Sequence, residues 1–165
     1  MTAPQPTLAG FQNFVTSVMG ITPGNLPPGS IWISIAFSQA LAIVNPALRV
    51  VPIPAMDPAG VTLNSGGFSV YSLAVYNLAA SNLLGLAQDQ MGRTYFKKLR
   101  KELNINGFVS GVVSASADES TSVAIVVQEA AKNFTLANLQ QLKDPYGRAY
   151  LALAQSYGQS TWGMN

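Results

Sequence analysis

The sequence predicts a mainly α-helical domain, a small helical bundle with a long central helix, which carries a β-hairpin and flexible terminal arms. Three observations support this prediction. Apolar residues recur at helical spacing in several segments. One of these segments, from Ser69 to about Asp89, is apolar around most of its circumference, as expected of a central helix. Residues 107–127 are rich in partly alternating β-branched side chains, which favour strands. The 165 residues suffice for a single domain, residues 1–165, with a hydrophobic core.

Two helices are expected in the N-terminal third of the chain. Residues 1–7 contain two prolines and are predicted to form a loose N-terminal arm. A first helix is expected over residues 8–19, and a stretch rich in proline and glycine separates it from a second helix over residues 30–44. Ser30 is a suitable N-cap for the second helix, and Pro46 ends it, because a residue before proline avoids the α region. The helical spacing of the first helix is set by Leu8, Phe11, Val15 and Val18.

The central helix is expected after a proline- and glycine-rich loop over residues 51–67. Ser69 opens this helix, which is the longest of the chain and runs to about Asp89. A basic segment over residues 93–101 follows and continues as a helix to about Leu103. The small residues of the central helix should let neighbouring helices approach closely; they are Ala74, Ala79, Ala80 and Gly85.

The C-terminal part combines the β-hairpin with a last helix. The hairpin is predicted over residues 107–127, with a mobile loop over residues 114–122 at its tip. A short helical or irregular segment is expected over residues 133–142. Asp144 is a suitable N-cap for the last helix, which has a proline at its first position. Residues 158–165 are predicted to form a C-terminal tail. The candidate residues at the hairpin tip are Ser116, Asp118 and Glu119.

The composition excludes several kinds of catalytic site. The chain contains no histidine and no cysteine. Catalysis by Ser-His-Asp or Cys-His groups is therefore excluded, as are zinc sites built from histidine or cysteine. An enzyme acting through carboxylates or Ser/Lys pairs stays as an alternative, but no catalytic spacing supports it. We expect a protein that is not an enzyme, with no catalytic residues, no metal ligands and no cofactor.

The distribution of charge suggests a surface covered by other protein. Only 10% of the residues are charged, against roughly a quarter in typical domains, and the first charged side chain is Arg49. A monomer rarely exposes so little charge, so we expect much of this surface to pack against other copies of the chain. The alternative is a monomer whose surface is covered by serine, threonine, asparagine and glutamine.

No membrane association is expected. The longest apolar run covers residues 31–44 and includes three polar side chains, so it is shorter than the roughly 20 residues that a spanning helix needs. No cationic segment precedes an apolar core, so we expect no signal peptide.

The basic segment is the sharpest charge feature of the chain, because it holds five of the nine basic residues. It is a candidate surface for nucleic acid or an acidic partner. Two other interpretations stay open: the solvated face of an amphipathic helix, and the inner wall of a ring through which DNA passes. The basic residues are Arg93, Lys97, Lys98, Arg100 and Lys101.

The C-terminal tail offers candidate anchors for a partner. An exposed tryptophan in a flexible end is unfavourable unless it packs somewhere, and aromatic side chains are frequent anchors at interfaces. Packing of Trp162 onto its own domain is the alternative. The candidate docking residues are Tyr157, Trp162 and Met164.

Taken in order, three parts of the sequence resemble the head-tail connector (adaptor or neck) proteins of tailed bacteriophages. The first is the helix around Tyr71-Ser72-Leu73-Ala74 and Leu86-Ala87. The second is the Gly-Val-Ser-rich segment, with Gly107-Phe108-Val109-Ser110, Val113-Ser114-Ala115-Ser116 and Ser122-Val123. The third is Pro145-Tyr146-Gly147-Arg148-Ala149-Tyr150-Leu151-Ala152-Leu153. The resemblance covers about residues 67–157.

The resemblance implies a structural virion protein at the head-tail junction, assembled in the host cytoplasm. Such proteins form a homo-oligomeric ring, typically of twelve copies, between the portal protein and the tail or the next neck protein. The ring extends the DNA channel, so genomic DNA would pass through it without sequence readout. By analogy, the tail over residues 158–165 would dock on the portal, and the hairpin would face the channel or a ring neighbour. The runner-up function is a small nucleic-acid-binding protein that uses residues 93–101.

Overall fold

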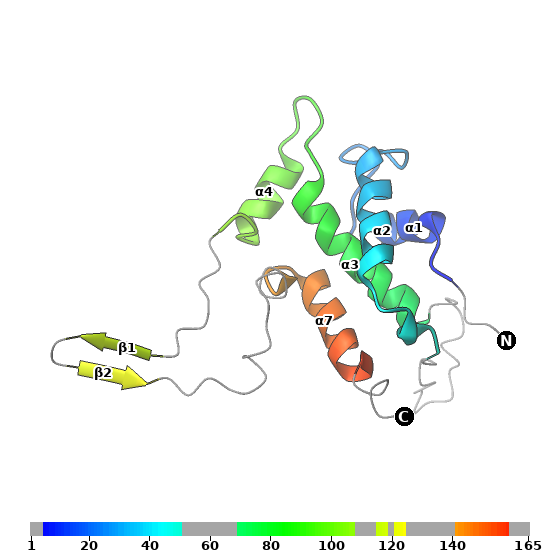
Figure 1. The fold of residues 1–165 in the computed structure, drawn as a ribbon. Coiled ribbons are helices and arrows are strands. Elements are labelled where there is room, and N and C mark those ends of the chain that lie inside the picture. Colours follow the sequence, from blue (N-terminus) through cyan, green and yellow to red (C-terminus); the bar gives the residue numbers. More distant parts are fainter. Residues whose placement is uncertain (1–4, 51–68, 108–114, 119–120, 125–140, 159–165) are drawn as a thin grey trace, which may run out of the picture.

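The computed structural model describes residues 5–50, 69–107, 115–118, 121–124 and 141–158. These residues form five α-helices, one 3₁₀ helix and two short strands (Figure 1). The predicted mainly α-helical class is therefore confirmed. The elements are α1 Leu8–Ser17, α2 Ile31–Ile43, the 3₁₀ helix η1 Pro46–Val50, α3 Val70–Leu86, α4 Tyr95–Glu102, β1 Ala115–Asp118, β2 Thr121–Ala124 and α7 Pro145–Gly158.

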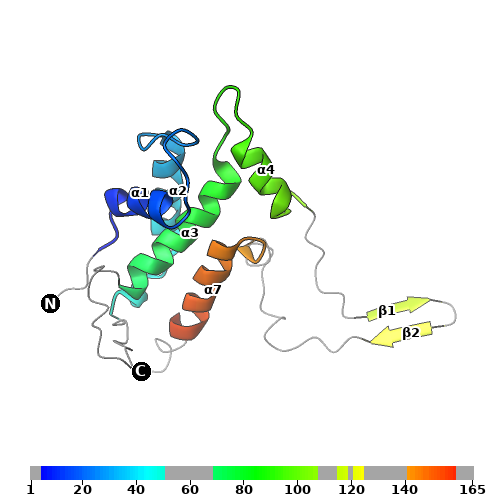
Figure 2. The same cartoon turned by 180° about the vertical axis from the view of Figure 1, so that it is seen from behind.

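Helix α3 is the centre of the bundle, as its apolar circumference predicted. Eleven of its seventeen residues are buried, and it contacts α1, α2, η1, α4 and α7. Figures 1 and 2 show α1 and α2 on one side of α3 and α7 on the other. Ala74, Ala79 and Ala80 are fully buried and allow this close packing. Gly85, expected to do the same, is instead exposed.

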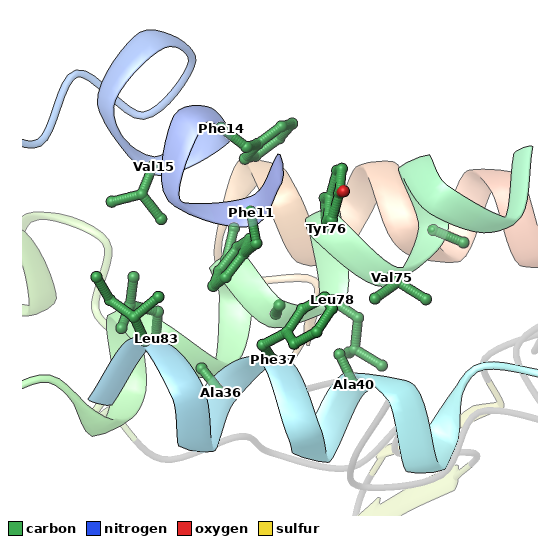
Figure 3. Packing of buried hydrophobic residues seen from close by; sticks show 14 of the residues in the cluster. Phe11, Phe14, Val15, Ala36, Phe37, Ala40, Val75, Tyr76, Leu78 and Leu83 are labelled. Atoms are coloured by element: carbon green, nitrogen blue, oxygen red, sulfur yellow. The ribbon is translucent and has the colours of Figure 1, made fainter. Parts of the chain in front are cut away.

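Aromatic rings join the N-terminal helices to α3. Phe11 and Phe14 of α1, Phe37 of α2 and Tyr76 of α3 lie with ring centroids 5.8–6.5 Å apart (Figure 3). Tyr146 of α7 meets the ring of Phe14 edge-on at 6.2 Å. Each such contact adds roughly 0.5–1.5 kcal/mol to the burial of the rings themselves. The cluster thus connects three helices to the central one.

The predicted helix starts are confirmed at α2 and α3. Ser69 caps α3, because its hydroxyl accepts a hydrogen bond from the backbone N–H of Ser72 at 3.0 Å. Ser30 occupies the N-cap position of α2, although its side chain makes no capping bond.

The end of the predicted N-terminal arm is fixed to the body of the protein. Thr7 is the N-cap of α1, and its hydroxyl accepts from the N–H of Gly10 at 3.0 Å. The Tyr76 hydroxyl accepts from the N–H of Thr7 at 3.1 Å and donates to its carbonyl oxygen at 3.3 Å. A side chain at position 10 would collide with that hydroxyl, which explains the glycine there. Residues 1–4 of the arm lie outside the described residues.

Helix ends are the part of the helical prediction that needs correction. Helix α1 ends at Ser17 rather than Met19, and α3 ends at Leu86 rather than Asp89. Helix α2 ends before Pro46, as expected. The chain then forms the 3₁₀ helix η1, which was not predicted. The predicted irregular loop over residues 51–67 and the segment over residues 133–140 lie outside the residues that the structure describes.

Two short antiparallel strands lie within the segment predicted as a hairpin. β1 pairs with β2, and Asp118 is the register partner of Thr121. The predicted tip loop over residues 114–122 is therefore too long. The small side chains in this segment do not favour a strand, but strands pair through backbone hydrogen bonds, which do not depend on side chains. The hairpin over residues 107–127 otherwise lies largely outside the described part of the chain and stays a prediction.

In the segments that the structure describes, no helix combines the length and the apolar character that crossing a bilayer requires.

Two tyrosines of α7 predict the response of the fold to alkaline pH. Burial raises the pKa of Tyr150 above its ordinary value, and burial, followed by the nearby Tyr95 and Asp144, raises the pKa of Tyr146. A phenol with a raised pKa in the folded state stabilises the fold while it is neutral. That contribution is complete below about pH 10 and is lost as the pH rises through the raised values. We expect the free energy of unfolding, measured in urea, to fall above about pH 10. An equal fall in the Tyr146→Phe, Tyr150→Phe double variant would contradict this assignment.

Candidate functional site

Helix α4 carries most of the basic segment and is anchored at its first turn. The Asp89 carboxylate accepts hydrogen bonds from the backbone N–H groups of Phe96 at 2.7 Å and Lys97 at 3.0 Å. Phe96 is fully buried in the core, and its ring meets that of Tyr95 edge-on at 5.2 Å. Asp89 thus anchors the first turn of α4 and lies outside α3. An aspartate shortly before a helical segment was the sequence signal for this role.

Three lysines form one exposed face of α4, which we call the lysine face: Lys97, Lys98 and Lys101. Lys101 follows Lys97 by four residues and Lys98 by three, so it neighbours both on the side of the helix opposite the buried Phe96. Three mobile ammonium groups on one face can hold phosphate groups or a carboxylate-rich surface, but they carry no base-specific geometry.

The two arginines of the predicted basic site hold the structure together. The guanidinium of Arg100 donates from one nitrogen to the carbonyl oxygens of Leu84 at 3.1 Å and Ala87 at 2.6 Å. These carbonyls lie at the C-terminal end of α3, where backbone acceptors lack helical partners. Arg93 donates to the side-chain oxygen of Asn25 at 3.0 Å. The structure therefore brings the three lysines together and uses Arg93 and Arg100 to fasten α4 and the loop before it.

The other predicted site residues are placed only in part. Tyr157 is partly buried and packs against the hydrophobic core of its own chain. Trp162 and Met164 lie outside the described residues, as does Glu119. Ser116 lies within β1 and not in a tip loop, and it is the register partner of Val123. Asp118 is the last residue of β1.

A cavity of about 510 Å³ opens where four distant segments meet: the end of α2, the second half of α3, residues 105–106 and residues 141–144. Its size is typical of pockets that bind small molecules or peptide side chains. The sequence does not predict this cavity, because no motif links these segments. Its polar lining consists of Gln39, Ser81, Asn82, Asn106, Gln141 and Asp144, and its apolar lining of Ile43, Leu86 and Ile105.

The charged groups beside this cavity are already bonded. Asp144 is 4% exposed, and its carboxylate accepts from the N–H of Gly147 at 2.8 Å and from the Ser81 hydroxyl at 2.7 Å. It thereby caps α7, as predicted, and ties α7 to α3. The Lys143 ammonium donates to the carbonyl oxygens of Ile105 and Gly107. These bonds hold the four segments around the cavity in place.

Two amide atoms beside the cavity lack partners. The side-chain nitrogen of Asn82 and the side-chain oxygen of Gln141 are buried and make no hydrogen bond within the described structure. Leaving a buried polar atom unpaired is unfavourable by roughly 1–3 kcal/mol. Such a pair, one donor and one acceptor, marks this cavity as a candidate binding site.

The chain has no match among known protein families, curated proteins or solved structures. Within the described ranges, no three acidic side chains lie together in an arrangement that could hold a metal ion. The described residues thus offer two candidate sites, the lysine face of α4 and the amide-lined cavity.

Proposed function

We propose that the protein is a structural, non-catalytic component of a tailed-phage virion, a head-tail connector that forms a ring between the portal protein and the tail or the next neck protein. The observation that carries this proposal is the surface of α1 and α2. Residues 5–48 contain no charged side chain, yet Val18, Ile31 and Ile43 are 58–63% exposed. Charged residues are depleted at the core of protein–protein interfaces, so a surface that carries no charge fits an interface.

A second copy of the same chain is the partner that best fits this surface. A charged partner would lose hydration on binding and find no opposite charge in return. The exposed surfaces of α1 and α2 are both uncharged, so the one on a subunit can cover the other on its neighbour without that penalty. Contacts between two different faces of identical subunits close into a ring when the rotation permits. Twelve copies is the number that the resemblance to connector proteins implies.

The lysine face of α4 suits the wall of a DNA channel. Its three ammonium groups would contact phosphates without reading bases, which lets DNA slide past. We place the β-hairpin over residues 107–127 at the channel or against a neighbouring subunit, and we place the assembled ring at the head-tail junction of the virion after assembly in the host cytoplasm.

The lysine face also supports a second candidate function, a small nucleic-acid-binding protein. Reversal of Lys97, Lys98 and Lys101 to glutamate separates the two. A binding protein that neutralises three phosphates with these lysines would lose about 2.7 from the slope of log affinity against log salt concentration. A connector subunit would still form rings, because the lysines take no part in the uncharged surface.

The measurement combines DNA binding at several salt concentrations with the sedimentation of the variant. The matched control replaces the same three lysines with glutamine, which removes charge without adding repulsion. Rings from the glutamate variant, together with weak DNA binding by the unaltered chain, are the expected result. Tight DNA binding by an unaltered chain that never assembles would favour the second candidate function.

A further inference from the structure

The cavity between α2, α3 and α7 contains a glycine that no neighbour among the described residues requires. Gly85 lies in the last turns of α3 and is exposed. A side-chain carbon added there would meet nothing within 4 Å. A glycine inside a helix is less stable than alanine by roughly 0.5–1 kcal/mol. Since no neighbour in the described structure requires this glycine, the space above it fits the close approach of a group from another molecule.

The unpaired amides beside Gly85 indicate the chemistry of that group. The nitrogen of Asn82 is a donor and the oxygen of Gln141 is an acceptor, and both residues line the cavity. A rotation about the last side-chain bonds would turn them toward it. A peptide group satisfies both together, because its carbonyl accepts and its N–H donates. The cavity therefore suits a polypeptide segment better than an ion.

The charge and the apolar lining of the cavity indicate which kind of polypeptide segment it could bind. The Asp144 carboxylate is bonded to Ser81 and Gly147, so the cavity offers no unpaired acid to a cationic ligand. Its apolar wall suits a large uncharged side chain. The C-terminal segment over residues 159–165, Gln-Ser-Thr-Trp-Gly-Met-Asn, has no charged side chain and contains Trp162.

The length of α7 decides whose tail can reach the cavity. The cavity lies at the start of α7, beside Asp144, whereas the tail begins after Gly158, the last residue of α7. At about 1.5 Å per residue, the fourteen residues of α7 separate these points by roughly 20 Å. The four residues from Gly158 to Trp162 span at most about 14 Å when extended. The tail of the same chain would therefore have to run fully extended along α7 to bring Trp162 to the cavity, whereas the tail of a second copy is free of that limit.

We propose that this cavity binds residues 159–165 of a second copy of the chain, with Trp162 against its apolar wall and the tail backbone against Asn82 and Gln141. This inference rests on the proposed function, since it supplies a contact between neighbouring subunits of the ring. Each copy gives its tail to the next and receives one in turn, which is a head-to-tail contact of the kind that closes a ring.

The test uses full-length chains and a labelled peptide with the sequence of residues 158–165. The receptor carries Trp162→Ala, so that the tails of other receptor copies cannot compete with the peptide. We expect the peptide to bind, and a peptide with alanine in place of Trp162 to bind at least tenfold more weakly. Adding Gly85→Phe to the receptor should also weaken binding at least tenfold, because the ring fills the cavity. Gly85→Ala is the matched control: it should keep binding and raise the unfolding temperature. Circular dichroism checks that each receptor is folded.

Mixing two variants then distinguishes exchange between copies from packing within one copy. A chain with Gly85→Phe keeps its tail, and a chain with Trp162→Ala keeps its cavity. We expect neither to form rings alone, and the two to form one-to-one pairs when mixed, as measured by sedimentation. The inference is overturned if the peptide does not bind or binds the Gly85→Phe receptor equally well.

Whether the chain forms a ring is measured separately from peptide binding. Rings formed normally by the Gly85→Phe chain would overturn the inference and leave the proposed function standing. In another outcome, the peptide binds and Gly85→Phe blocks this binding, but the unaltered chain forms no ring, either alone or with virions. That outcome would uphold the docking site and contradict the proposed ring.

Discussion

Replacement of Phe96 by alanine is expected to lower the free energy of unfolding by about 3–5 kcal/mol. Phe96 is fully buried, and it is the buried side chain of α4. Its loss would remove the contact that holds this short helix to the core, while the Asp89 cap and the Arg100 bonds would hold only its ends. Because the total stability of a domain is roughly 5–15 kcal/mol, the change is a large part of it.

Urea unfolding gives the magnitude, and hydrogen exchange shows where the structure loosens. Backbone amides of α4 should lose protection first. Lys98→Ala, on the exposed side of the same helix, is the matched control and should change stability by less than about 0.5 kcal/mol. A loss below about 1 kcal/mol for Phe96→Ala would mean that the core does not depend on α4.

The second large effect is expected at Asp144. Replacement by alanine removes the cap of α7 and leaves the Ser81 hydroxyl without its acceptor. The two losses together should destabilise the chain by about 2–4 kcal/mol. The effect should also reach the cavity, because Asp144 connects α3 to α7 at its edge.

Asparagine at this position separates bonding from charge. Asp144→Asn keeps an oxygen that accepts from the N–H of Gly147 and an NH₂ group that donates to the Ser81 oxygen. It should therefore recover most of the stability lost in Asp144→Ala, as measured by thermal unfolding. Equal damage in the two variants would show that the negative charge, and not the pair of hydrogen bonds, is what this site requires.

The features that the sequence predicted correctly are those with local causes. The central position of α3 follows from an apolar circumference, which is visible in the residues themselves. The caps at Ser69 and Asp144 follow from side chains that bond to the backbone three residues ahead. Helix ends were less well predicted: α3 ends at Leu86, and Asp89 bonds instead to the first turn of α4, which begins six residues further on.

Features that depend on contacts between distant segments could not be predicted from the sequence. The basic segment was visible, but only the structure separates the lysine face from Arg93 and Arg100, which bond to residues 13–68 positions away. The cavity joins four segments and has no motif. Gly85 was expected to allow close packing within the chain, but it is exposed and lines the cavity.

The central claim, that copies of the chain form a ring at the head-tail junction, is tested most directly by imaging. Electron microscopy of the full-length protein, alone and on particles that contain it, would count its rotational symmetry. We predict a closed ring, with twelve-fold symmetry, between the portal and the tail. A chain that stays monomeric in finished particles, or lies away from the junction, would contradict the claim.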